Sequence, residues 1–167
     1  ILDLPARRVT ALLSTMPQVT VAKVNGFCFT GALELALACD LMVVADEAKL
    51  GDTHAKFGIR PTWGMSQRLP RAVGTQAARE LSLTARTFTG AEARSLGMAA
   101  RSAPLAELDT EVADLVTAIL ANRDDALRAY KALSRQTQEL PLSQALAYEY
   151  GTDYDIGDTA ERLAGFR

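Results

Sequence analysis

The chain has 167 residues, a length that favours one domain or slightly more. Apolar residues make up 49% of it, which is enough for a substantial core. Its 18 basic and 20 acidic residues leave a net charge of −2, so the composition provides no field for nucleic acid or for an anionic membrane.

Cysteine content and hydropathy further limit the class of protein to which the chain can belong. Cys28 and Cys39 lie within apolar runs and are too few for the disulfide framework of a secreted domain. The apolar runs are too short to span a bilayer, and residues 1–8 lack a signal-peptide pattern. These features exclude a zinc module and a coiled coil, and they predict a soluble, cytoplasmic α/β domain without a metal.

The first third of the chain predicts a crossover unit of the α/β kind. Residues 20–24 are rich in β-branched side chains and run into the turn Asn25-Gly26, while residues 41–45 form a continuous apolar run typical of a buried strand. Between them, residues 31–38 are rich in Ala and Leu and predict a short helix. Strand, turn, helix and strand together give a parallel pair with a helical connection.

The remainder predicts mainly helices. Glycines and Pro61 make residues 51–64 mostly loop, with a short helical turn. Further on we expect helices at 74–84, 105–121, 125–138, 142–150 and 158–166, a capped helix between Thr89 and Gly97, and a strand at 98–101. Two or three strands cannot bury both faces of a sheet. We therefore expect the sheet to continue outside this chain or in another subunit, with residues 1–16 as the tail of an earlier unit.

Two residues of the predicted helix at 31–38 carry chemical interest, each with an alternative. Gly31, at the helix start, either presents its N–H to a developing oxyanion or serves only as a structural helix start. Glu34 lies one turn later among apolar neighbours. Its carboxylate is either solvated on a polar line of the helix or partly buried, where it suits acid–base work.

Several motifs in order resemble the crotonase superfamily of enoyl-CoA hydratases, isomerases and relatives. The runs that carry the resemblance are VNGFCFTGALELALACDLMVVADEAKLG, GIRPTWGMSQRLPRAVG, LTARTFTGAEARSLGMA and, more weakly, the closing ERLAGFR. They cover residues 17–166. The resemblance implies an α/β fold in which residues 1–103 form part of a ββα spiral core. It also implies that residues 104–167 form a helical region used for trimerisation.

The resemblance also implies roles for individual residues. Gly31 matches the glycine whose N–H forms half of the oxyanion hole, and Glu34 matches the first of two glutamates that activate water. The family's N-terminal part, which carries the other oxyanion N–H and much of the coenzyme A surface, is not present in this chain. Coenzyme A is expected only as part of the substrate, with no separate cofactor.

The first departure from the family pattern is His54, which stands where the second glutamate is expected in Gly-x-x-Glu. His54 either exchanges a proton with the substrate or lines the pocket as a polar group, with the second acid–base function lost. The role of nearby Asp52 stays open, because residues two apart share a face on a strand but diverge on a helix.

The second departure is a bulky loop at 61–65. Thr62, Trp63 and Met65, together with Phe29, are predicted to line a reshaped acyl pocket, although Trp63 alternatively packs on the following helix. The basic residues Lys49, Lys56, Arg60 and Arg68 are expected to be solvated surface charges.

These observations predict an enoyl-CoA hydratase-like enzyme that adds water to a 2-enoyl-CoA thioester. The catalytic residues would be Glu34 and His54, with Gly31 in the oxyanion hole. Two alternatives remain: isomerisation or other acyl-CoA enolate chemistry with one carboxylate, and acyl-CoA binding without turnover. The expected assembly is a homotrimer or a dimer of trimers, without nucleic acid or membrane partners.

Overall fold

The computed structural model describes residues 2–157 and 159–165. Its contacts group into two compact units, one formed by residues up to 16 with 20–117, the other by 17–19 with the chain from 118 onward. The predicted division between residues 103 and 104 falls inside the first unit, and as a division between functional parts it stays a prediction.

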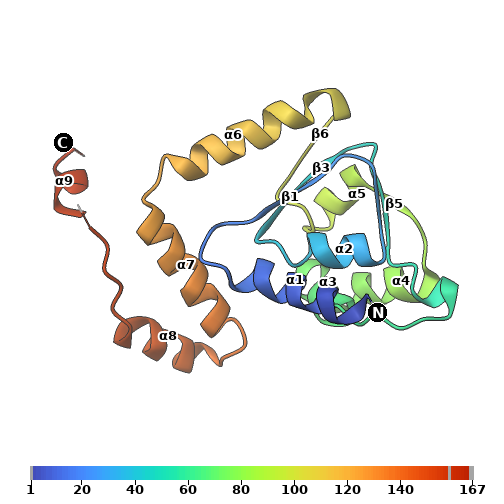
Figure 1. The fold of residues 1–167 in the computed structure, drawn as a ribbon, viewed down its shortest axis with the longest axis horizontal. Coiled ribbons are helices and arrows are strands. Elements are labelled where there is room, and N and C mark those ends of the chain that lie inside the picture. The colour runs from blue at the N-terminus through green and yellow to red at the C-terminus, as the bar shows by residue number, and fades with distance from the viewer. Residues whose placement is uncertain (1, 158, 166–167) are drawn as a thin grey trace. The chain divides into compact units, whose positions relative to one another are not determined.

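The strands of the first unit form two small sheets (Figure 1). The first is parallel throughout, in the order β1 (Val21–Val24), β3 (Leu41–Ala45) and β6 (Arg101–Ala103). In the second, β4 (Lys49–Gly51) lies between β2 (Phe27–Phe29), to which it is parallel, and β5 (Phe88–Thr89), to which it is antiparallel.

The strand pair β3–β4 repeats the pair β1–β2: β3 lies parallel to β1, and β4 lies parallel to β2. Val21 of β1 lies opposite Leu41 of β3, and Phe27 of β2 lies opposite Lys49 of β4. Helix α2 (Gly31–Ala36) connects the two strand pairs. This arrangement confirms the predicted crossover and is part of a ββα spiral.

Three strands were not predicted, and the predicted bounds of a fourth strand, β6, were wrong. β2, β4 and β5 are only two or three residues long and lie next to turns, so they have no periodicity to detect. The strand predicted at 98–101 begins three residues later than its predicted start. The N–H groups of Met98 and Ala99 bond to the carbonyl of Ala93 in the preceding helix. The N–H of Ala100 is then the first to bond to β3, at the Met42 carbonyl, and the strand register starts at Arg101.

The helices follow the predicted pattern with small shifts at their ends. They are α1 (Asp3–Thr15), α3 (Met65–Val73), α4 (Thr75–Thr84), α5 (Gly90–Ser95), α6 (Leu108–Leu120), α7 (Asp124–Thr137), α8 (Leu142–Gly151) and α9 (Thr159–Ala164), with 3-10 turns at Ala55–Phe57 and Leu105–Glu107. Residues 158 and 166 of the last predicted helix lie outside the described residues. Helix α1 was not predicted, and no bounds were predicted for α3. The Thr89 hydroxyl caps α5 by accepting the N–H of Glu92, as expected.

The core of the first unit surrounds helix α2. Val43 and Val44 of β3 are fully buried, as expected for a strand covered on both faces, and Leu33 of α2 is fully buried as well. Helix α2 contacts α1 and α3, so little of its surface is left for solvent. The environment of Glu34 therefore depends on residues outside its own helix.

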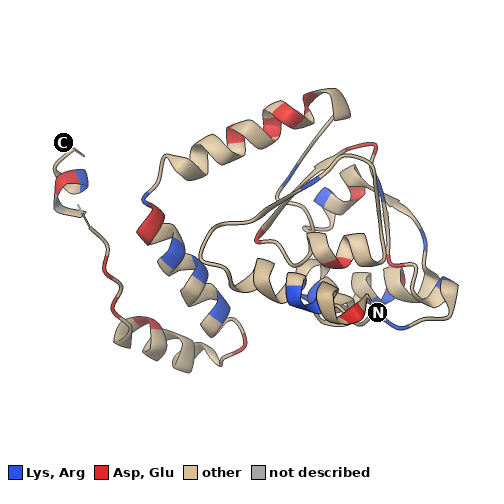
Figure 2. Cartoon of the chain, in the orientation of Figure 1, with Lys and Arg blue, Asp and Glu red and all other residues tan. Residues whose placement is uncertain are grey.

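Acidic and basic residues are distributed over both units. Figure 2 shows acidic residues on α6 and basic residues along α7, and both signs occur in each unit. Among the described residues, no helix combines the length and apolar character that a bilayer crossing requires.

Candidate active site

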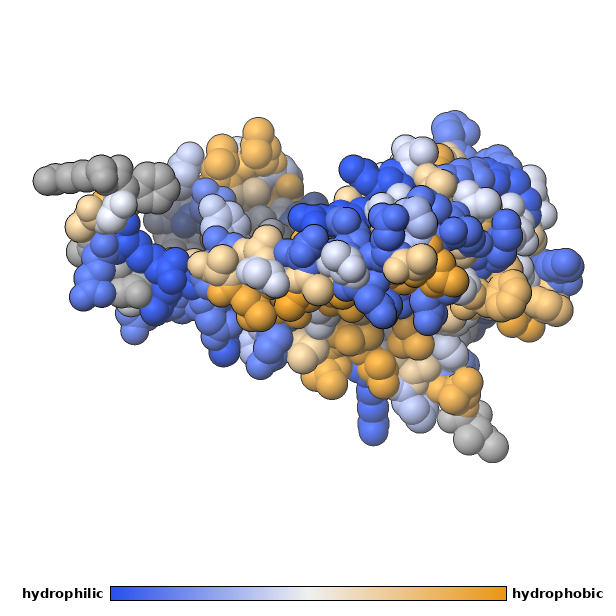
Figure 3. Space-filling model, turned by 90° about the horizontal axis from the view of Figure 1, so that it is seen from above, coloured by the Kyte–Doolittle hydropathy of each residue, from blue (hydrophilic) through white to orange (hydrophobic). Residues whose placement is uncertain are grey.

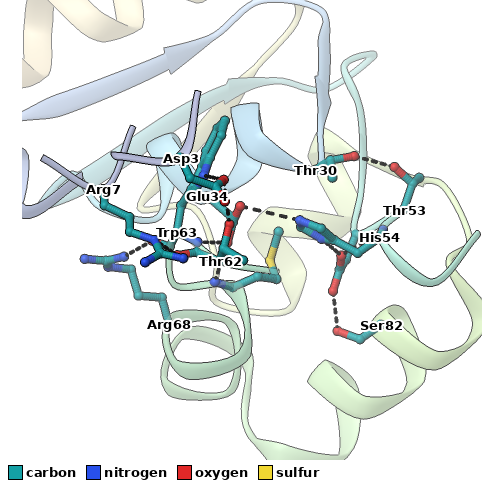
Figure 4. A network of polar contacts seen from close by, with 12 residues as sticks. Asp3, Arg7, Thr30, Glu34, Thr53, His54, Thr62, Trp63, Arg68 and Ser82 are labelled. Carbon is teal, nitrogen blue, oxygen red and sulfur yellow. Dashed lines mark hydrogen bonds and ion pairs between the residues drawn. The ribbon is translucent and has the colours of Figure 1, made fainter. Parts of the chain in front are cut away.

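Glu34 is the centre of a buried polar network (Figure 4). It projects from α2 with only 2% of its surface exposed. Its Oε1 atom accepts hydrogen bonds from the backbone N–H groups of Trp63 and Met65, both at 2.9 Å. A buried carboxylate without such donors would lower the free energy of unfolding by about 3 kcal/mol or more. The two N–H groups therefore hold Glu34 in place and leave Oε2 for other partners.

The loop that supplies these donors depends on Gly64. Gly64 has φ +123°, a conformation that L side chains rarely adopt, and it lies between the two residues that donate to Glu34. The Arg68 guanidinium, which donates to the Trp63 carbonyl at 2.7 Å, would lie 2.0 Å from a Cβ at position 64. Burial lowers the pKa of Arg68, while the nearby charge of Glu34 acts in the opposite direction.

His54 faces Glu34 from the other side. Its Nε2 lies 3.5 Å from Glu34 Oε2, and its Nδ1 lies 2.6 Å from Asp52 Oδ1. The hydroxyl of Ser82 in α4 donates to Asp52 Oδ2 at 2.7 Å. Ser82, Asp52, His54 and Glu34 thus form one chain of polar contacts, and the last three are all more than nine-tenths buried.

The start of α2 adopts an unusual backbone conformation. Thr30, the residue before Gly31, has φ 53° and ψ −113°, a conformation that costs a β-branched residue about 1–3 kcal/mol. Hydrogen bonds hold it there: the Thr30 N–H donates to the Gly51 carbonyl, and the hydroxyls of Thr30 and Thr53 are bonded to each other. The ψ angle of Thr30 sets the direction of the Gly31 N–H, for which the described residues provide no acceptor.

The Trp63 indole lies against Gly31. A Cβ at position 31 would come within 2.3 Å of Trp63 Cζ3. The indole N–H and the Thr62 hydroxyl both donate to Asp3 Oδ1 of helix α1, each at 3.0 Å. These two bonds hold the pKa of Asp3 below its ordinary value. Helix α1 therefore fixes the loop that also binds Glu34.

An open cavity of about 490 Å³ joins these groups. Its walls bring together Gly31, Glu34, His54, Thr62 and Trp63, five of the residues predicted for the site. The same walls include Asp3, Thr30, Ile59 and Arg60. No cluster of three or more His, Cys, Asp or Glu residues suited to a metal ion occurs among the described residues.

Two predicted pocket residues do not line this cavity. Phe29 packs against Gly51 and stacks on Phe27 with ring centroids 6.0 Å apart, because it lies on the strand before the turn into α2. Met65 is fully buried and contributes its backbone N–H to Glu34 instead of a side chain to the cavity.

The prediction that Arg68 is a solvated surface charge was wrong. It is half-buried and bonds to Trp63 and Ser14, whereas Lys49, Lys56 and Arg60 are exposed as expected.

Asp52, Ser82 and Asp3 were not predicted as part of the site. Asp52 carried a weak signal in its position two residues before His54, but residues 52–54 form no regular strand or helix that would fix its direction. Ser82 and Asp3 carried no signal, because each reaches the site only through the packing of α4 and α1.

The Enoyl-CoA hydratase/isomerase family profile matches residues 4–167. The chain belongs to this family. It is 32% identical over 163 residues to the crotonyl-CoA hydratase of Syntrophomonas wolfei, covering 96% of this chain and 63% of that enzyme. The chain spans less than two thirds of the length of the curated relatives it matches.

Solved structures of the enoyl-CoA hydratase/isomerase family share the fold. An enoyl-CoA hydratase from Bacillus anthracis superimposes with a TM-score of 0.84 at 31% identity, over 87% of this chain and 56% of that one. A Thermobifida fusca protein crystallised with acetoacetyl-CoA superimposes with a TM-score of 0.82 at 33% identity, over 95% of this chain and 60% of that one.

The contact between Gly31 and Trp63 is directly testable. Gly31→Ala places a methyl group where the indole lies, so we expect the indole to move into a more polar environment. The emission of Trp63 should shift to longer wavelength, and the free energy of unfolding should fall by about 1–2 kcal/mol. Fluorescence and urea titration measure both.

Gly26→Ala is the matched control, because a Cβ at position 26 meets nothing within 4 Å. A Trp63→Phe variant identifies the contribution of Trp63 to the emission. An unchanged Trp63 spectrum in Gly31→Ala would contradict the described packing.

Proposed function

We propose that the intact protein adds water across the double bond of a 2-enoyl-CoA thioester at this cavity. One observation carries the proposal: Glu34 Oε2 and His54 Nε2 lie 3.5 Å apart in residues that line the same cavity as Gly31. A water molecule that contacts both atoms would have an acceptor for its proton and a neighbouring acid. The amide of Gly31 would stabilise the charge on the thioester oxygen.

The reaction balances with these groups alone. Glu34 Oε2 accepts a proton from water as the water oxygen bonds to C3, and the C2–C3 π electrons move into the thioester as an enolate. His54 starts this cycle as an imidazolium, with a proton on both ring nitrogens, and the enolate takes the Nε2 proton onto C2, which leaves a neutral ring protonated at Nδ1. The proton on Glu34 returns to His54 across the gap between them, which restores both groups. Stabilising the enolate oxygen contributes about 3 kcal/mol for each well-placed N–H.

Family members support this substrate class. The S. wolfei relative is a crotonyl-CoA hydratase, and the T. fusca structure holds acetoacetyl-CoA, a thioester of coenzyme A. In this chain the wall formed by Thr62 and Trp63 would shape the acyl end of the cavity. Coenzyme A enters as part of the substrate, and the protein needs no further cofactor for these steps.

Hydration is tested by turnover of crotonyl-CoA and longer 2-enoyl-CoAs with the intact protein. We expect Glu34→Gln and His54→Gln each to lower kcat by about 100-fold or more, because either change removes a group that exchanges a proton. His54→Glu, which introduces the glutamate typical of the family, should retain more activity than His54→Gln. Glu107→Gln, an exposed glutamate outside the cavity, is the control and should match the unmodified protein.

Turnover no higher than that of Glu34→Gln on every chain length would contradict hydration. Product analysis with a 3-enoyl-CoA then separates isomerisation from binding alone. Acyl-CoA binding measured by calorimetry without any product would identify a non-catalytic binding protein.

We also propose that the protein assembles as a homotrimer or a dimer of trimers. Figure 3 shows clusters of apolar side chains on the face drawn there. Helix α8 has no buried residue, and Leu142, Leu146 and Tyr150 are spaced by four residues, which places them on one face. Their exposed fractions are 74%, 37% and 77%, so this face of α8 is available to another subunit.

Light scattering of the intact protein tests the assembly. We expect Leu146→Asp to shift the mass toward the monomer, because it buries a charge in the proposed contact. Leu83→Asp, on an exposed residue of α4, is the control and should leave the mass unchanged. A monomeric unmodified protein would contradict the proposed assembly.

A further inference from the structure

Asp52 is a buried carboxylate that does not line the cavity, and the hydration steps above do not use it. It is 4% exposed and lies behind His54 as seen from Glu34. Its Oδ1 atom lies 2.6 Å from His54 Nδ1 and accepts a hydrogen bond from the His54 backbone N–H at 3.4 Å. Its Oδ2 atom accepts a hydrogen bond from the Ser82 hydroxyl. Each oxygen of Asp52 therefore accepts one hydrogen bond from a fixed donor, the His54 backbone N–H or the Ser82 hydroxyl, which suits an ionised, acceptor-only carboxylate.

This arrangement determines which ring nitrogen of His54 carries a fixed proton. A carboxylate that only accepts can form a hydrogen bond with His54 Nδ1 at 2.6 Å only when that nitrogen carries a proton. The ring is thereby held with Nε2 toward Glu34. Since Nδ1 is committed to Asp52, Nε2 is the nitrogen that exchanges a proton with the cavity.

A histidine needs such a partner more than a glutamate would. The two oxygens of a carboxylate are equivalent, so a glutamate at position 54 could exchange a proton through either one. An imidazolium that gives up its Nε2 proton keeps the Nδ1 proton and becomes a neutral ring. If the neutral ring carried its proton on Nε2, giving that proton away would leave an imidazolate, which is inaccessible near neutral pH.

We propose that Asp52 is a positioning residue that holds the Nδ1–H form of His54, and that Ser82 orients Asp52 for this task. The proposal rests on the proposed function for its consequence in catalysis, since it makes Nε2 the group that delivers the proton to C2. Asp52 itself stays ionised throughout and exchanges no proton. Ser82 acts one step further out, by fixing the second carboxylate oxygen.

The tautomer is measured by nitrogen-15 NMR of the histidine ring in the intact protein. His54 is the only histidine in this chain, and its signal is identified by its loss in His54→Gln. We expect Nδ1 to be protonated in the unmodified protein. In Asp52→Asn the side-chain amide donates to Nδ1, so the neutral ring should carry its proton on Nε2. A purely structural role for Asp52 would not change the tautomer.

Kinetics supply the second readout. We expect Asp52→Asn to lower kcat by about 100-fold or more, while KM for the enoyl-CoA changes by less than about threefold because Asp52 does not line the cavity. Ser82→Ala should lower kcat by about fivefold, the effect of one lost hydrogen bond. Asp46→Asn, the same change at a residue outside the cavity and the Glu34 network, should have no effect.

An Nε2–H neutral tautomer in the unmodified protein would overturn the proposal, and so would Asp52→Asn with kcat within threefold of the unmodified protein. If Asp52→Asn fails to fold, the tautomer of the unmodified protein and the kcat of Ser82→Ala decide: an Nδ1–H ring with a lowered kcat supports the proposal, and either result reversed contradicts it. An Nδ1–H ring in an unmodified protein without turnover would contradict hydration while supporting the positioning of His54 by Asp52.

Discussion

The burial of one carboxylate constrains the rest of the site. Glu34 is 2% exposed on a helix that is packed between α1 and α3, so its charge must be satisfied inside the protein. Two backbone N–H groups of the loop after Pro61 do this, and they converge on Oε1 because Gly64 turns the chain between them. The remaining oxygen, Oε2, is thereby aimed at His54.

The loop that binds Glu34 is held from outside as well. Asp3 of α1 accepts both the indole N–H of Trp63 and the hydroxyl of Thr62, and Arg7 donates to the Thr62 carbonyl. Arg68 ties the Trp63 carbonyl to α3. Contacts from two helices therefore restrict the motion of a loop that has no regular structure of its own, and rigid support of this kind keeps a catalytic group in position.

Local sequence patterns were sufficient to predict the elements whose residues are mostly apolar. The apolar run at 41–45 and the Ala/Leu-rich segment after Gly31 predicted β3 and α2, since both depend on short-range preferences. The environment of Glu34 was not predictable from its own helix, because the groups that contact its carboxylate belong to His54, Trp63 and Met65, which lie much later in the chain. For Trp63 the sequence left two interpretations, lining the pocket or packing on the following helix; the residue lines the cavity, and its indole lies against Gly31 at the start of the earlier helix α2.

The replacement of a glutamate by His54 explains why a third acid group belongs to the site. The asymmetry of an imidazole requires one nitrogen to be fixed before the other can exchange a proton, and Asp52 is the group in contact with that nitrogen. Its two-residue spacing from His54 gave only a weak signal, since the turn into the 3-10 segment at Ala55–Phe57 decides where both side chains point. Resemblance to the family pointed to position 54, but the residue that makes a histidine useful there was found only in the structure.

The proposed hydration requires a thioester that lies with its oxygen at the Gly31 amide and its reacting carbons beside Glu34 and His54. The most direct test is a crystal structure of the intact protein with a non-reactive enoyl-CoA analogue. We predict the carbonyl oxygen within hydrogen-bond distance of the Gly31 N–H, with C2 and C3 facing Glu34 Oε2 and His54 Nε2. An analogue whose carbonyl lies away from Gly31, or whose C2 and C3 are turned away from both side chains, would contradict hydration at this site.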